Sequence, residues 1–257
     1  MTRIVLQRYY PYLCKTMRVI FLHHAGGDKY SWRRYQEALS PQIEQIYLEL
    51  PGRGDRFSEP LLDTTEAMIE DLFQQILPHI QSPYIIVGKS MGALHTYLLL
   101  HRIATSAKTL PLHVFLGSRK CPASYSTHER IAQRDSEGFW EGVKGYGGCP
   151  PALLQHKELM ELYEPILRAD FQALETFSFE SKPVLPVAAT IMVGKDDHIK
   201  LSETDSWQNH FSGEVNFFEM LGGHFFMHEQ AFTIGKMIEE QFVNAVYKQQ
   251  PAEGFPV

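Results

Sequence analysis

The sequence predicts an α/β fold, with a mostly parallel central sheet flanked by helices and a helical lid inserted late in the chain. Short β-rich runs alternate with helical patterns along most of the 257 residues, which is typical of a parallel sheet with crossover helices. A hydrophobic content of 44% is enough for one large core. We therefore expect residues 1–257 to form a single domain.

Six runs carry the strand signal, because each is short and rich in β-branched or aromatic residues. They are residues 18–22, 45–50, 84–87, 113–116, 187–193 and 215–218.

Two helices are marked clearly. Thr64 or Thr65 can cap a helix whose apolar positions recur every four residues and should face the sheet. Those positions are Met68, Leu72, Ile76 and Ile80. A last helix is predicted from about residue 229 to residue 246, before a polar tail with two prolines at 249–257.

One stretch interrupts the alternation. Residues 121–182 contain no convincing strand, and their helical segments at 136–143, 152–162 and 166–177 surround a glycine- and proline-rich break. Because the strand pattern resumes afterwards, we interpret this insertion as a lid over the sheet that shapes a substrate pocket.

Charge and composition exclude several classes of protein. A formal net charge of -6 disfavours nucleic acid as a partner. No apolar run approaches the roughly 20 residues of a membrane span and no secretory core follows the N-terminus, so we expect no membrane partner and a cytoplasmic location. Cys14, Cys121 and Cys149 form no close pair, which predicts neither disulfides nor a zinc site.

The strongest chemical motif is G-x-S-x-G at residues 88–92. It follows the strand at 84–87 and precedes a helical stretch at 93–103. A tight strand-to-helix turn needs these glycines and presents the hydroxyl of Ser90 at the helix N-terminus. We therefore predict Ser90 as a nucleophile.

A serine nucleophile requires a base and a carboxylate, which in this order of elements follow the serine along the chain. Asp196 and Asp197 follow the strand that ends at Val193, and His224 follows the next strand. All of them should lie at the same sheet edge as Ser90. His224 is the predicted base, in preference to a surface-loop histidine, and either aspartate could orient it.

Two further loops complete the predicted site. The turn after the first strand should supply one oxyanion N–H, from Ala25, and the residue after the serine the other, from Met91. His24 in the same turn is interpreted as a brace rather than a second base. His224 and His228 are four residues apart, but Phe225 replaces the glutamate of an H-E-x-x-H zinc motif, so no metal is expected.

These motifs resemble the α/β-hydrolase fold and, within it, the stand-alone type II thioesterases that accompany nonribosomal peptide and polyketide synthases. The resemblance spans about residues 18–243, and two of its strings are absent from general esterases. The matching strings are HAGG at 24–27, LPGRGDRFSEP at 50–60, GKSMG at 88–92, YEPILRADF at 163–171 and GGH at 222–224. The chain departs from the family at His23, where proline is usual, and at Lys89, where histidine is usual.

The resemblance implies a nucleophile, acid and base at Ser90, Asp197 and His224, because the family's G-x-x-D spacing from Gly194 selects Asp197 over Asp196. It implies no cofactor. The implied substrates are acyl groups on the phosphopantetheine arms of carrier protein domains, and the implied role is the removal of acetyl or other wrong groups from stalled carriers by a monomer.

Three alternatives remain. A medium-chain fatty acyl thioesterase would share even the specific strings, a carboxylesterase or lipase would share the triad, and a non-catalytic binding protein of the same fold would need neither Ser90 nor His224. Lys89, Arg119 and Lys120 are the cations that the predicted topology places best to meet the phosphate of the arm or the face of the carrier domain near the mouth of the site.

Overall fold

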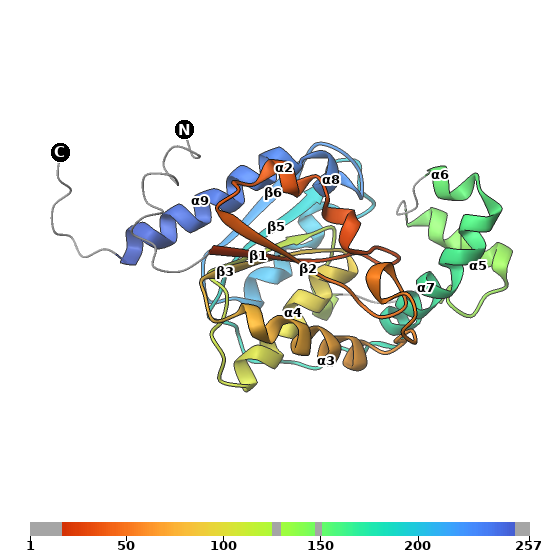
Figure 1. Cartoon of the computed structure of the whole chain (residues 1–257), viewed down its shortest axis with the longest axis horizontal. Helices are drawn as coiled ribbons and strands as arrows, with labels where there is room; N and C mark the ends of the chain where they lie inside the picture. The colour runs from red at the N-terminus through yellow and green to blue at the C-terminus, as the bar shows by residue number, and fades with distance from the viewer. Residues whose placement is uncertain (1–16, 125–129, 147–150, 250–257) are drawn as a thin grey trace.

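A computed structural model describes residues 17–124, 130–146 and 151–249, and in it six parallel strands form one sheet (Figure 1). The order across the sheet is β2-β1-β3-β4-β5-β6. The strands are β1 (Met17–Leu22), β2 (Ile43–Leu48), β3 (Tyr84–Lys89), β4 (His113–Gly117), β5 (Ala188–Gly194) and β6 (Val215–Met220). The predicted α/β class is confirmed.

The second strand was predicted two residues too late. Leu48 is its last residue and pairs with Leu22 of β1. Glu49 lies beyond the ladder, where its N–H donates to the side chain of Gln75 and its carboxylate accepts from the backbone N–H groups of Lys29 and Asp55. The strand end was predicted too late because the apolar run in the sequence continues to Leu50. In the structure, the loop contacts of Glu49 take the place of strand pairing there.

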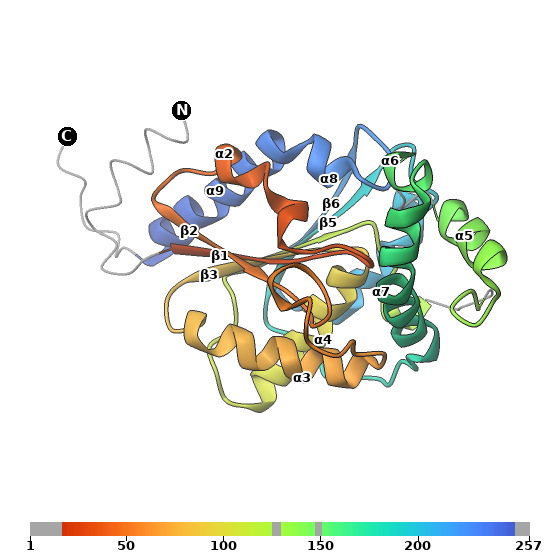
Figure 2. The ribbon, with the colours of Figure 1, turned by 45° about the vertical axis from the view of Figure 1, so that its right-hand side comes forward.

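Helices cover both faces of the sheet (Figure 2). One face packs against α3 (Thr65–Ile76) and α4 (Met91–Thr105), and the other against α2 (Tyr35–Ala38), α8 (Phe226–Glu229) and α9 (Ala231–Gln249). Short 3-10 turns are η2 (Lys29–Trp32), η3 (Gly54–Arg56), η4 (Leu77–His79), η5 (Pro122–Ser124), η6 (Leu201–Glu203) and η7 (Asp205–His210).

The predicted cap and the burial of the apolar stripe are confirmed, but α3 ends at Ile76 and Ile80 follows the 3-10 turn η4. The hydroxyl of Thr64 accepts from the N–H of Ala67 at 3.4 Å and caps the helix. All four residues of the predicted apolar stripe are buried against the sheet: Met68, Leu72, Ile76 and Ile80.

The lid consists of α5 (Ser136–Gly145), α6 (Pro151–Leu154) and α7 (Lys157–Thr176), which lie beyond the carboxyl ends of the strands (Figures 1 and 2). The prediction of a break between residues 162 and 166 was wrong, since α7 continues through Pro165. Glu164 and Arg168 form an ion pair one turn apart, which holds the helix together where the proline removes a hydrogen bond. The break lies instead before α7, where His156 is its N-cap residue.

Cys121 is a free, buried thiol, whereas Cys14 and Cys149 lie outside the described residues. Within the described ranges, no helix has the length and apolar character needed to cross a membrane.

Candidate active site

Ser90 occupies a strained turn between β3 and α4. Its backbone has φ 53° and ψ -113°, and its N–H donates to the carbonyl of Gly117 at 2.8 Å. A Cβ atom on Gly88 would lie 2.3 Å from the carbonyl oxygen of Gly92, and one on Gly92 would lie 2.2 Å from that of Leu22. Both glycines of the motif are therefore required for α4 to approach the sheet closely.

His224 lies beside Asp197, as the two loops after β5 and β6 bring them together. The Nδ1 atom of His224 is 3.1 Å from both carboxylate oxygens of Asp197. Asp197 is buried, whereas Asp196 is exposed. The loops can approach this closely because a Cβ on Gly194 would lie only 2.4 Å from the carbonyl oxygen of Gly223.

The electrostatic environment keeps this pair in a useful protonation state. Burial opposes ionisation of Asp197, but hydrogen bonds from His198 and His224 outweigh it and hold the pKa of the carboxyl well below its usual range. Burial lowers the pKa of His224 below 6.5, and the hydrogen bond to Asp197 offsets part of that effect. At neutral pH the pair is thus a carboxylate beside a neutral imidazole, which can accept a proton.

Within the described residues, one group of side chains could hold a metal ion. It consists of Asp197, His198 and His224, whose ligand atoms lie within 4.8 Å of one another. Nδ1 of His198 lies 2.9 Å from Asp197 Oδ1, so both imidazoles already compete for one carboxylate. Any ion bound there would displace the contact that orients His224.

Ser90 and His224 line a common cavity of about 70 Å³ beneath the lid. Its remaining walls come from the turn after β1, the loop after β4, the lid and the loop after β5: His24, Ala25, Ser118, Arg119, Val143, Tyr146, Leu167, Phe171, Leu174, His198 and Ile199. We call it the inner cavity. Ala25 is in its wall, and the N–H of Met91, as the first in α4, has no acceptor within the helix.

Asp170 of the lid helix α7 belongs to the YEPILRADF string, and in the structure it holds the lid to the loops beneath it. Its fully buried carboxylate accepts two bonds from Arg53, at 2.7 and 2.8 Å, and one from the N–H of Gly26 at 2.7 Å. The LPGRG and LRADF strings thus meet at one buried ion pair. This pair joins the lid to the turn that contains Ala25.

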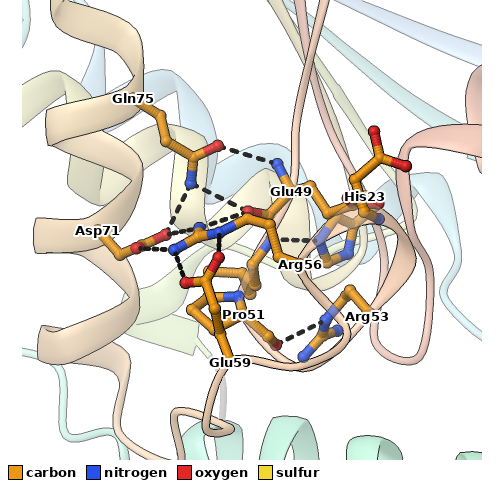
Figure 3. A network of polar contacts seen from close by, with 10 residues as sticks. His23, Glu49, Pro51, Arg53, Arg56, Glu59, Asp71 and Gln75 are labelled. Carbon is orange, nitrogen blue, oxygen red and sulfur yellow. Dashed lines mark hydrogen bonds and ion pairs between the residues drawn. The ribbon is translucent and has the colours of Figure 1, made fainter.

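Arg56 and Glu59 of the LPGRGDRFSEP string belong to a polar network with Glu49, Asp71 and Gln75 (Figure 3). Arg56 donates to the side chains of Glu59 and Asp71 and to the carbonyl of Glu49. Gly54 has φ 51°, and a Cβ there would collide with the carboxylate of Glu49. The network fixes the loop after β2, from which Arg53 reaches the lid.

The predicted docking cations were wrong at two of three positions. Lys89 is fully buried, with Nζ 3.4 Å from the ring centroid of Phe225, and Arg119 is 5% exposed and lines the inner cavity. Only Lys120 is partly open to solvent, and it pairs with Glu203. The lid and α8 cover the sheet edge at which topology placed these residues.

Two other residues of the site have clear surroundings. The ring of His24 packs edge-on against Phe225, and burial lowers its pKa well below 6.5, so it is neutral at pH 7. Ser118, which the sequence analysis missed, has φ 54° and donates its hydroxyl to the carbonyl of His224 at 3.3 Å. Its position directly after β4 was the signal that could have revealed it.

Comparisons with known proteins identify the family of the chain. A family model for the thioesterase domain matches residues 17–242. Linear gramicidin dehydrogenase LgrE of Brevibacillus parabrevis is 30% identical over 84% of each chain. Although that protein is named a dehydrogenase, the family model assigns the matching region of this chain to the thioesterases.

Other relatives carry the name thioesterase. Thioesterase PikA5 of Streptomyces venezuelae is 28% identical over 93% of this chain and 85% of its own length, and the medium-chain S-acyl fatty acid synthase thioesterase of Homo sapiens is 28% identical over 84% and 83%. Among solved structures, ClbQ from the colibactin NRPS/PKS pathway shares the fold with a TM-score of 0.85, at 24% identity over 90% of this chain and 99% of its own. The chain therefore belongs to the thioesterase family and is a thioester hydrolase.

Proposed function

We propose that this protein removes aberrant or stalled acyl groups from the phosphopantetheine arms of carrier protein domains, using Ser90, His224 and Asp197 as a catalytic triad and no cofactor. The observation that carries the proposal is the pair formed by His224 and the buried carboxylate of Asp197, in the wall of the cavity that contains Ser90. Such a pair fixes the tautomer that leaves Nε2 free to accept a proton.

In the first step the hydroxyl of Ser90 transfers its proton to Nε2 of His224, and its oxygen bonds to the thioester carbonyl carbon. The resulting oxyanion accepts hydrogen bonds from the N–H groups of Ala25 and Met91. The C–S bond then breaks, the arm departs as a thiol with the proton from His224, and the acyl group remains as an ester of Ser90. A thiol with a pKa near ~8.5 leaves readily, so this step needs little assistance.

In the second step water transfers a proton to His224 while its oxygen bonds to the acyl carbon. Collapse of this intermediate breaks the bond to Ser90, which regains its proton from His224, and the acid is released. Asp197 remains ionised throughout and stabilises the imidazolium that forms in both steps.

The size of the inner cavity supports a short acyl group. A volume of about 70 Å³ is small beside the range of about 300–1,000 Å³ that accommodates ligands of drug size. That space fits an acetyl or small aminoacyl group better than a medium-length chain. The second candidate, hydrolysis of medium-chain fatty acyl groups, is favoured by the similarity to the human fatty acid synthase thioesterase.

Carrier proteins loaded with acetyl, aminoacyl and medium-chain fatty acyl groups would separate the two candidates. Incubation with the enzyme, followed by intact-mass measurement of the free arm, should show release of acetyl and aminoacyl groups at least tenfold faster than release of medium-length chains. Preferred release of medium-length chains would select the fatty acyl function. Strong hydrolysis of simple esters with negligible turnover of every loaded carrier would identify a carboxylesterase instead.

A further inference from the structure

A second and larger cavity adjoins the site of Ser90. Its volume is about 500 Å³, within the range of about 300–1,000 Å³ that accommodates ligands of drug size. It shares His24, Ala25, Val143 and Leu167 with the inner cavity, so the two are neighbours across a common wall. We call it the outer cavity.

The outer cavity has an apolar side and a cationic side. Leu153, Leu159 and Tyr163 of the lid form the apolar wall. Arg33 and Arg34, between η2 and α2, also line the cavity, and both are exposed cations.

Among the residues that the structure describes, no acidic side chain pairs with these two arginines. The carboxylate in the cavity wall belongs to Asp28, and it already accepts from the N–H groups of Tyr30 and Ser31 as the N-cap of η2. Arg34 donates to the carbonyl of His228 at 3.3 Å, and neither arginine forms a salt bridge within the described residues.

We propose that the outer cavity holds the phosphopantetheine arm of the carrier and that Arg33 and Arg34 bind its phosphodiester, an assignment that rests on the proposed function. The arm is a neutral chain of amides that carries its one anionic group at the end remote from the thioester sulfur. The two cavities match this order of groups along the arm. The phosphate would lie at the cations in the wall of the outer cavity, and the thioester would reach Ser90 in the adjoining inner cavity. Guanidinium groups bind phosphate oxygens through paired N–H donors, which suits them to this role.

This assignment replaces the sequence-based docking residues, of which Lys89 and Arg119 are buried. It also explains how a chain with a net charge of -6 can recognise an anionic substrate. The two cations at the cavity act at short range, whereas salt screens the repulsion from the more distant negative charges of the protein.

The test compares acetyl-pantetheine with acetyl-4′-phosphopantetheine, two substrates that differ only in the phosphate. Wild-type enzyme should hydrolyse the phosphorylated ester with at least tenfold higher kcat/KM, through a lower KM. In the double variant Arg33→Ala/Arg34→Ala this ratio should fall to within twofold of unity, because kcat/KM falls more for the phosphorylated ester than for acetyl-pantetheine. Arg33→Lys/Arg34→Lys should restore part of the preference, and the exposed Lys236→Ala on α9 should keep all of it.

Other outcomes overturn the assignment. A phosphate preference that persists in the double alanine variant would place the phosphate elsewhere, and an equal loss on both esters would make the arginines structural. Equilibrium binding of 4′-phosphopantetheine and pantetheine to Ser90→Ala protein, with and without the two arginines, separates this proposal from the catalytic one. Phosphate-dependent binding that needs the arginines supports the site even if no thioester is hydrolysed, and binding that ignores the phosphate contradicts it even if hydrolysis is fast.

Discussion

The sheet edge around Ser90 and the lid above it are positioned by different kinds of contact. At the sheet edge, backbone atoms touch where glycines allow it, as between Gly92 and the carbonyl of Leu22. The lid has a small hydrophobic cluster of its own. It is joined to the body by side chains, both through Ala173 and Leu174 in the main core and through buried polar contacts such as Asp170 with Arg53. The turn that presents Ser90 is thus placed by backbone packing, while the element that shapes the substrate space is held by side-chain contacts.

The largest expected effect concerns the acid at the sheet edge. Asp197→Asn should lower kcat by about 10³–10⁴-fold, because an amide cannot stabilise the imidazolium and favours the wrong tautomer of His224. Asp196→Asn is the matched control, since its side chain is exposed, and it should remain within about twofold of wild type. Steady-state rates on acetyl-loaded carrier measure both, and a greater loss at Asp196 would move the role one residue back.

The next effect concerns the lid contact. Asp170→Asn leaves the buried guanidinium of Arg53 uncompensated, and breaking such a pair costs about 3–5 kcal/mol. Urea unfolding should show that loss, and kcat should fall as well because the N–H of Gly26 loses its carboxylate acceptor. The exposed pair of Arg102 and Glu70 is a control, since Glu70→Gln should change stability by less than about 1 kcal/mol. An equal loss of stability in Asp170→Asn and Glu70→Gln would contradict the claim that the buried ion pair of Asp170 holds the lid.

Two glycine substitutions, one at the sheet edge and one in the lid, test how tightly each region is packed. Gly92→Ala puts a methyl group against the backbone of β1 and should destabilise the protein by about 1–3 kcal/mol or more. Gly145→Ala, at the end of α5 in the lid, meets no atom within 4 Å and should be neutral or slightly stabilising. Thermal unfolding of both variants measures the two effects. A Gly92→Ala variant as stable as wild type would show that backbone packing at the sheet edge is less tight than described.

A smaller effect is expected in the pH dependence. The base must be neutral to act, and burial lowers the pKa of His224, so kcat/KM should fall on acidification with a midpoint below 6.5. The neighbouring charge of His198 also lowers that pKa, and His198→Ala should therefore shift the midpoint upward. A rate profile between pH 4 and 8 measures both, and a midpoint above 6.5 in the wild type would contradict the account.

The sequence predicted the sheet edge better than the lid, for a physical reason. Motifs such as GKSMG and GGH describe local turns, and their glycines are adjacent in sequence to the side chains that they position. The bond between Arg53 and Asp170 joins residues 117 positions apart, and no local pattern indicates it. Burial of Lys89 likewise depends on Phe225, a residue in a loop far along the chain, so topology alone misplaced it at the surface.

The central claim, that Ser90 at this sheet edge carries the acyl group during hydrolysis, is tested most directly by its own substitution. Wild-type protein mixed with acetyl-loaded carrier should release free arm and should be labelled at Ser90 by a serine-directed fluorophosphonate, as located by peptide mass. Ser90→Ala should retain its folded circular dichroism spectrum, lose the label and lose at least about a thousandfold in turnover. Turnover within tenfold of wild type, or a label on another residue, would contradict the account.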